Sequence, residues 1–141
     1  MELTKRALLA TLLTLSPIAA TADVALIVNP ANSVSEISID EAKRLYLGKT
    51  GNYPDGSTAE VIDQAAGKSS RAVFYKKVVG KSESQAKAYW SKQIFTGKGT
   101  PPEEVNGDDA VKAKVASTPS AVGYIDAAAV DGSVKQVLLV Q

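Results

Sequence analysis

The stretch TAEVIDQAAGKSSRAVFYKKVV, residues 58–79, contains the features that decide the fold. Residues 58–63 combine β-branched and small residues in a short run, which predicts a strand. Residues 64–70 are small and polar and include a glycine, so they predict a turn. Residues 71–79 place apolar side chains at helical spacing. The stretch therefore predicts a strand, a glycine turn and a helix in direct succession.

The turn is also the candidate ligand site. A helix start leaves backbone N–H groups without partners and carries the positive end of the helix dipole, so it attracts anions. Lys68, Ser69, Ser70 and Arg71 would add side-chain donors and positive charge there. The structural alternative is that Ser69 or Ser70 only caps the helix. The sequence leaves both interpretations open.

The first 22 residues have the pattern of a secretory signal peptide. Lys5 and Arg6 form a basic start, residues 7–19 are apolar, and residues 20–22 (Ala-Thr-Ala) match a small-x-small cleavage site. A membrane anchor is the alternative, but 13 apolar residues fall short of the roughly 20 that span a bilayer. We expect cleavage after Ala22 and a single domain over residues 23–141, located in the periplasm.

Composition excludes several classes of function. Without the leader, 14 basic and 14 acidic residues remain, so a neutral chain has no long-range attraction for nucleic acid or anionic lipid. The absence of cysteine and histidine removes disulfides, thiol nucleophiles, the commonest general base and most zinc sites. Carboxylates remain the only plausible acid–base groups. Asp63 and Asp126, which each end a predicted strand, are a conceivable catalytic pair, and the structural alternative is that they cap or face water. We expect no catalytic residue, no metal site and no cofactor.

The rest of the chain alternates strands and helices. Strands are predicted at residues 24–28, 121–125 and 136–140, and helices at 39–47, 82–95 and 108–116. The run at 24–28 is continuously apolar, which is typical of a strand buried on both faces in a parallel sheet. Trp90 and Phe95 are interpreted as core anchors, with Ile94 also facing inward. The prediction is an α/β fold, a mostly parallel sheet flanked by helices.

Two further segments carry a resemblance to a known family. Residues 39–49, IDEAKRLYLGK, resemble the helix and aromatic-x-Gly segment of phosphate-type periplasmic solute-binding proteins. Residues 115–125, VASTPSAVGYI, resemble the later small-residue turn and Gly-Tyr strand of that family. The strand–turn–helix running through Phe74 lies between them, where the family grips its anion. The resemblance implies one lobe of a type II periplasmic binding protein, whereas a complete member has two lobes that close on a ligand.

The resemblance also locates the site and shows where this chain departs from the family. Gln64 stands where the family has an arginine, and Lys68-Ser69-Ser70 replaces its Ser-Gly-Thr turn. Arg71 could restore the missing guanidinium. The candidate ligand-binding residues are Gln64, Gly67, Lys68, Ser69, Ser70 and Arg71.

The resemblance implies a non-enzymatic protein that binds phosphate or a similar small oxyanion, in phosphate uptake or sensing. Its implied partners are an ABC transporter or another envelope protein, or a second copy of the chain that supplies the missing lobe. Nucleic acid is not among them. The alternative function is an envelope protein-interaction module that retains the lobe but not ligand binding.

Overall fold

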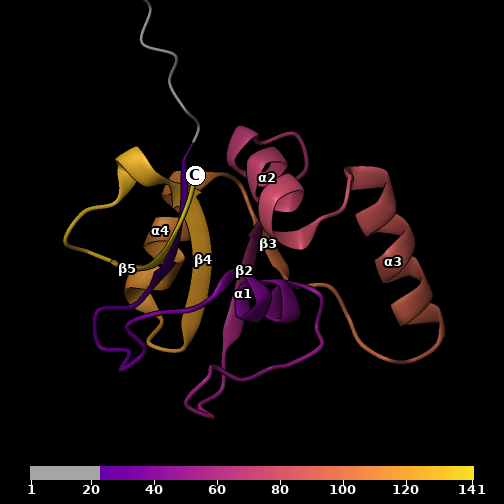
Figure 1. Ribbon diagram of the computed structural model, residues 1–141, viewed down its shortest axis with the longest axis horizontal. Helices are drawn as coiled ribbons and strands as arrows, with labels where there is room; N and C mark the ends of the chain where they lie inside the picture. The colour runs from indigo at the N-terminus through magenta and orange to yellow at the C-terminus, as the bar shows by residue number, and fades with distance from the viewer. Residues whose placement is uncertain (1–22) are drawn as a thin grey trace, which may run out of the picture.

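The computed structural model describes residues 23–141, so the predicted signal peptide lies outside the described residues (Figure 1). The described chain folds around one five-stranded sheet with the strand order β3-β2-β4-β1-β5. The strands are β1 (Val24–Val28), β2 (Glu60–Gln64), β3 (Glu103–Val105), β4 (Ala121–Asp126) and β5 (Lys135–Val140). The helices are α1 (Ile39–Tyr46), α2 (Ser69–Phe74), a π-helical turn (Tyr75–Val79), α3 (Glu83–Phe95), α4 (Asp108–Ser117) and a 3₁₀ turn (Ala127–Ala129).

Four of the five strands run in the same direction. β2 is parallel to β3 and to β4, while β1 is antiparallel to both of its neighbours, β4 and β5. The predicted α/β fold with a mostly parallel sheet is therefore confirmed, but the parallel setting expected for residues 24–28 is wrong. All five residues of β1 are buried, as the apolar run predicted. A continuous apolar run indicates that a strand is buried on both faces of the sheet, but it does not indicate the direction of the strand.

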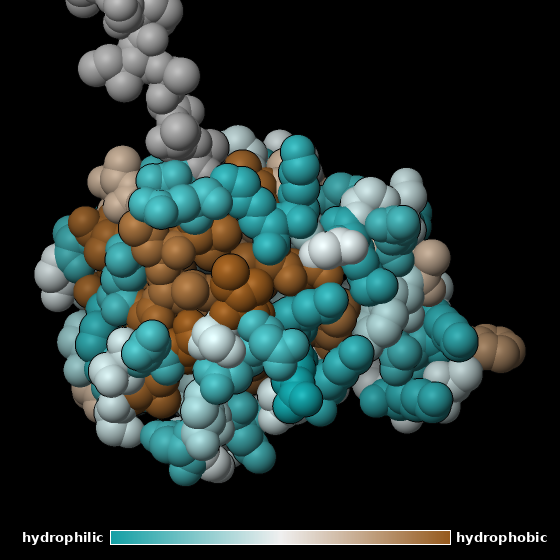
Figure 2. Space-filling model, viewed as in Figure 1, coloured by the Kyte–Doolittle hydropathy of each residue, from teal (hydrophilic) through white to brown (hydrophobic). Residues whose placement is uncertain are grey.

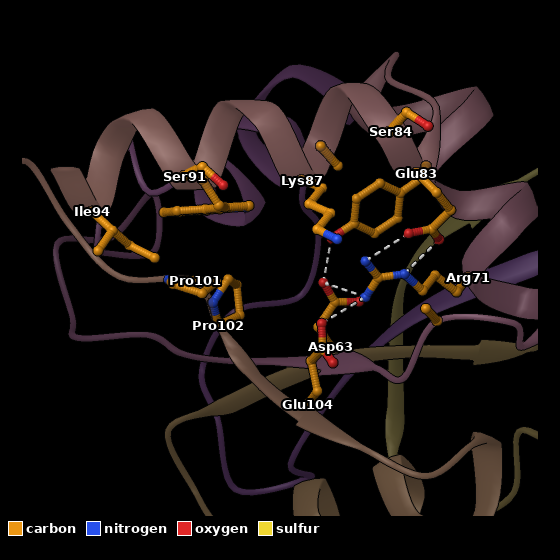
Figure 3. Close-up of a pocket in the computed structure, with 14 residues that line it drawn as sticks. Asp63, Arg71, Glu83, Ser84, Lys87, Ser91, Ile94, Pro101, Pro102 and Glu104 are labelled. Atoms are coloured by element: carbon orange, nitrogen blue, oxygen red, sulfur yellow. Dashed lines mark hydrogen bonds and ion pairs between the residues drawn. The ribbon is translucent and has the colours of Figure 1, made fainter.

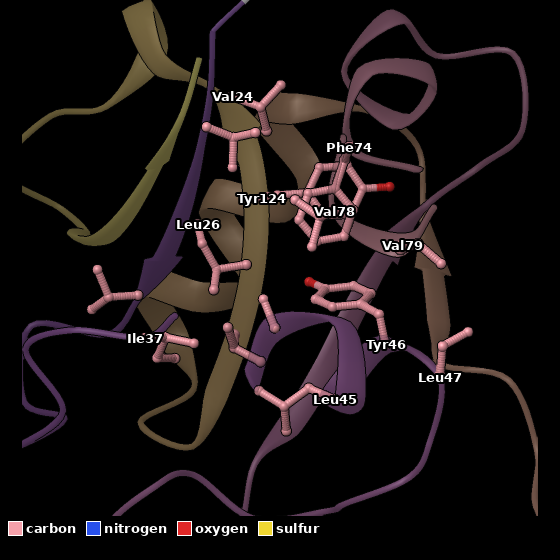
Figure 4. Close-up of a cluster of buried hydrophobic side chains, with 14 of the residues drawn as sticks. Val24, Leu26, Ile37, Leu45, Tyr46, Leu47, Phe74, Val78, Val79 and Tyr124 are labelled. Atoms are coloured by element: carbon pink, nitrogen blue, oxygen red, sulfur yellow. The ribbon is translucent and has the colours of Figure 1, made fainter. Parts of the chain in front are cut away.

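Helices cover both faces of the sheet and create two separate cores. On one face Leu26 packs with Tyr46 of α1, Phe74 of α2 and Tyr124 of β4 (Figure 4). The rings of Phe74 and Tyr124 stack with centroids 4.0 Å apart, which adds to the stability gained by burying them. On the opposite face, α4 packs on the odd-numbered residues of β1 and on β2 and β4. A bare glycine, Gly123, allows this approach, because a Cβ there would lie 2.4 Å from Val111.

α3 stands at the side of the molecule, outside these layers (Figure 1). Trp90 is buried, as predicted, and its ring packs so closely on Gly48 that a Cβ there would lie 2.9 Å from it. The inward placement of Phe95 and Ile94 is wrong, because their side chains are 92% and 55% exposed. The body of the protein reaches only the helix stripe that contains Ala86 and Trp90, and the last turn of α3 extends beyond it.

Candidate functional site

The predicted turn connects β2 to α2 as the sequence indicated. β2 ends at Gln64, Gly67 adopts a positive φ of 91°, and α2 begins at Ser69. The N-cap residue is Lys68, whose side chain makes no capping hydrogen bond. The alternative that Ser69 or Ser70 caps this helix is therefore wrong. Because no side chain caps the helix, its first N–H groups remain available to another acceptor.

Arg71 is buried and its donors are already engaged (Figure 3). Its Nε and Nη2 atoms bind the two carboxylate oxygens of Glu83, at 2.7 and 3.0 Å. Its Nη1 atom donates to the carbonyl of Gln64 at 2.6 Å and to Glu104 at 3.1 Å. The Nε–Nη2 edge of the guanidinium, which could bind an oxyanion in a bidentate manner, is thus occupied by Glu83 in the first turn of α3. Arg71 fastens α3 and β3 to the turn, and a free guanidinium for a ligand is not present.

Asp63, at the carboxyl end of β2, is the buried acceptor of the same network. The hydroxyls of Tyr75 and Tyr124 both donate short hydrogen bonds to it, and Arg71 Nη1 lies 3.5 Å away. Burial raises the pKa of the Asp63 carboxyl, and the tyrosine hydrogen bonds and Arg71 oppose that rise. Burial and the Asp63 charge raise the pKa of both tyrosines well above its usual range. Neutral tyrosines therefore act as fixed donors that hold Asp63 in place.

The two strand-end aspartates have separate structural roles. Asp126 is exposed and accepts a hydrogen bond from the Ala128 backbone at 2.9 Å, which caps the 3₁₀ turn. Asp63 is enclosed by Tyr75, Tyr124 and Arg71. Each carboxylate thus has its own structural partners, and nothing in this arrangement joins the two in an acid–base pair.

Gln64 is placed in the turn region, but its amide is also engaged. Its Nε2 atom donates to Asp108 at 2.8 Å and to the carbonyl of Tyr124 at 2.9 Å. These bonds tie β2 to β4 and to the start of α4. Ser70 is buried as well. Three of the six predicted site residues, Gln64, Ser70 and Arg71, are thus buried.

Gly67, Lys68 and Ser69 form the accessible part of the predicted site, which we call the open turn. Gly67 and Ser69 are exposed and Lys68 is half-buried. The Lys68 side chain lies against Gly107, within about 4 Å of where a Cβ would stand. Within residues 23–141, Lys68 forms no ion pair. The open turn therefore offers one free ammonium, one hydroxyl and an uncapped helix start.

A cavity of about 470 Å³ lies beside the turn, between α3 and the chain leading into β3 (Figure 3). Trp90, Ile94 and Lys87 line it from α3, and Pro101 and Pro102 face them. At its inner end lie three carboxylates and the Arg71 guanidinium, contributed by Asp63, Arg71, Glu83 and Glu104. Of the predicted site residues, only Arg71 lines this cavity. Sequence reasoning missed it because its walls come from segments up to about 40 residues apart.

Residues 23–141 contain no cluster of acidic side chains arranged to hold a metal ion. No helix over the same residues has the length and apolar character needed to cross a bilayer.

Several solved structures share the fold of this chain. No family model matches the sequence. A protein from Clostridium perfringens, assigned as a phosphate ABC transporter substrate-binding protein and solved with bound phosphate, superposes with a TM-score of 0.66 at 24% identity. An ABC-type phosphate transport receptor from Vibrio cholerae gives 0.65 at 24% identity, and PstS from Borrelia burgdorferi gives 0.60 at 16%. Each match covers 82% of this chain.

The fold is that of a solute-binding protein, and more particularly of the phosphate-binding type. The match extends over only 45–47% of those longer chains, so this chain spans less than half of their length. That extent corresponds to a single lobe of the fold, as the sequence resemblance implied.

Proposed function

We propose that this chain is a non-enzymatic, periplasmic solute-binding-type protein that binds phosphate or a similar small oxyanion at the open turn, in phosphate uptake or sensing. The observation that carries the proposal is the uncapped start of α2 beside the unpaired Lys68. This is also the position where the family resemblance places the anion. Structural likeness to proteins named for phosphate transport supports the class of ligand.

The donors available at the open turn set the strength of binding. Lys68 and Ser69 contribute side-chain donors, and the first turn of the helix contributes backbone N–H groups. One lobe provides one wall, so water reaches the bound anion and each ion pair contributes only about 0–1 kcal/mol. Three or four such contacts give at most about 3–4 kcal/mol, which corresponds to a dissociation constant in the low millimolar range.

Arg71 supports this site while groups of the protein itself occupy its donors. It holds the Gln64 carbonyl before the turn and Glu83 and Glu104 beside it. Three carboxylates surround Arg71, so an anion entering the cavity would meet net negative charge. The open turn lies outside that cavity, because none of its three residues lines it.

Equilibrium dialysis with labelled phosphate tests the proposal. We expect saturable binding near a millimolar dissociation constant that weakens as salt is added. The double variant Lys68→Ala/Ser69→Ala should lose it, while Lys98→Ala/Thr100→Ala, an exposed pair with the same change of charge, should not. Equal binding by both variants would place the anion elsewhere.

A protein-interaction module is the second candidate. It is favoured by one specific observation: the donors of Gln64 and Arg71, which would complete an oxyanion site, are bound to groups of the protein itself. If dialysis shows no phosphate binding at tens of millimolar, this second function takes the place of the first.

A further inference from the structure

The neutral charge of residues 23–141 conceals a strong segregation of charge along the chain. Residues 68–98 contain eight of the 14 basic residues and only one of the 14 acidic residues, Glu83. This segment, from the open turn to the end of α3, therefore has a net charge of +7, and the remainder has −7. Net charge alone predicted no attraction to anionic surfaces, but a surface that approaches this segment first meets positive charge.

The cationic side chains of this segment are directed to solvent. Lys76, Lys77, Lys87, Lys92 and Lys98 are all exposed. Within the described chain, none of these five forms an ion pair. Their charges are therefore not neutralised by neighbouring acids of the protein.

The end of α3 adds an apolar element to this basic surface. We call residues 92–98 the α3 tip. Phe95 is 92% exposed and Ile94 is 55% exposed, and Lys92 lies one turn before Phe95 on the same helix face. Lys98 is brought back to the tip by its backbone bond to the Gln93 carbonyl at 2.9 Å. Figure 2 shows hydrophobic surface projecting at this end of the molecule, next to hydrophilic residues.

The tip is held out by defined contacts farther back on the same helix. The Tyr89 hydroxyl donates to the Leu47 carbonyl at 2.6 Å, and Trp90 packs on Gly48. Glu83 anchors the first turn of α3 to Arg71. Gly97, with a φ of 68°, ends the helix in a left-handed turn. The apolar side chains are thus presented by an ordered helix end that projects beyond the body.

We propose that the α3 tip docks the protein on an anionic phospholipid surface, with Phe95 and Ile94 in the headgroup–acyl boundary and Lys92 and Lys98 on lipid phosphates. A projecting tip can be buried by a protein partner only if that partner has a matching pocket, whereas a lipid interface deforms around it. Aromatic and aliphatic side chains flanked by lysines suit such an interface. This inference uses none of the open-turn residues, so it stands apart from the proposed oxyanion binding.

Vesicle co-sedimentation of residues 23–141, which contain the whole sheet and both cores, tests the inference. We expect at least tenfold stronger partitioning onto vesicles of phosphatidylcholine and phosphatidylglycerol (7:3) than onto phosphatidylcholine alone, lost at high salt. Lys92→Gln/Lys98→Gln should weaken partitioning about 30-fold, at about fivefold per lysine. Phe95→Ser should weaken it about tenfold. Free phosphate at 10 mM should not compete, which separates lipid headgroups from the open turn as the phosphate partner (a working concentration of about ten times the expected dissociation constant).

Matched controls keep this test specific. Leu139→Ser removes another exposed apolar side chain, and Arg44→Gln/Lys114→Gln makes the same change of net charge at two ion pairs away from the tip. Both should partition like the parent protein. Equal partitioning onto the two vesicle types, or tip variants that behave like these controls, would overturn the inference. Binding to polyglutamate but not to vesicles would overturn it in favour of an acidic protein partner.

Discussion

Arg71 is the residue at which the candidate site and the fold are connected. Its guanidinium joins the end of β2, the first turn of α3 and the edge strand β3 through Gln64, Glu83 and Glu104. It also lies over the ring of Tyr75, 4.4 Å from the centroid. An arginine with these partners positions three elements. Removing all of its partners would leave a buried charge unpaired and would strongly lower the free energy of unfolding. Arg71 follows the open turn closely in the chain. Two of its nitrogen donors are occupied by Glu83 and would be freed if that carboxylate were removed.

Replacing Glu83 by glutamine tests this role. The substitution should lower the free energy of unfolding by about 1 kcal/mol, because Glu83 is half-exposed and Arg71 keeps its other partners. It should also strengthen phosphate binding about tenfold, since one edge of the guanidinium becomes available for a charge-assisted bond. Denaturant unfolding and dialysis measure the two effects, with the exposed Glu36→Gln as control. Unchanged phosphate affinity would show that the open turn is out of reach of Arg71.

The Asp63 carboxyl should titrate above its ordinary value of 3.8, because burial disfavours its charge. The folded state then holds a proton that the unfolded state has released. Stability therefore falls as pH rises from the unfolded pKa through the folded pKa, which is opposite to the usual effect of a paired aspartate. Side-chain ¹³C shifts of Asp63 followed against pH measure the midpoint directly. A midpoint at or below 3.8 would show that the tyrosine hydrogen bonds and Arg71 outweigh burial.

At the scale of elements, α3 is divided between an anchored half and a projecting end. Trp90→Ala should cost about 3 kcal/mol, the lower end of the range for a buried large aromatic, because one side of the ring faces the cavity. Phe95→Ala on the same helix should change stability by less than about 0.5 kcal/mol, since its side chain is exposed. Denaturant unfolding of the two variants decides this. Equal losses would contradict the arrangement of α3.

Local sequence signals predicted most of the helices and strands. They could not predict which distant segments of the chain contact one another. The capping boxes at Ser38 and Ser82 mark the starts of α1 and α3 because their partners, Glu41 and Gln85, lie three residues away. The exposed position of Phe95 depends on how far the body extends beside α3, which no local pattern records. β3 was missed because three residues beginning with two glutamates do not alternate as a strand does.

The candidate site shows the same division. The turn around Gly67 was predicted because its strand, glycine and helix are adjacent in the sequence. The partners of Arg71 were not, since Glu83 is 12 residues and Glu104 is 33 residues away. Only the folded chain shows that these acids occupy the guanidinium. Sequence alone can therefore indicate donors at a turn, but it cannot show which of them are free.

At the scale of the whole molecule, the predicted leader leads us to expect export. The mature protein should begin at Asp23, because Lys5, Arg6, the apolar run and the Ala-Thr-Ala site together match the pattern of a signal peptide. Intact-mass measurement of protein recovered from the periplasm of an expressing bacterium determines this. Protein that retains Met1 would contradict both the cleavage and the periplasmic location.

The most direct test of the central claim is a titration of the amide NMR spectrum of the whole domain with phosphate. Oxyanion binding at the open turn predicts saturable shifts of the Gly67, Lys68 and Ser69 amides with a dissociation constant near 1 mM, on the order expected for a few solvent-exposed charge-assisted contacts. The Lys68→Ala/Ser69→Ala variant should give flat curves while the rest of its spectrum remains that of the folded protein. If these amides stay unmoved at tens of millimolar phosphate, roughly ten times the weakest affinity expected, the chain does not bind oxyanions at this turn.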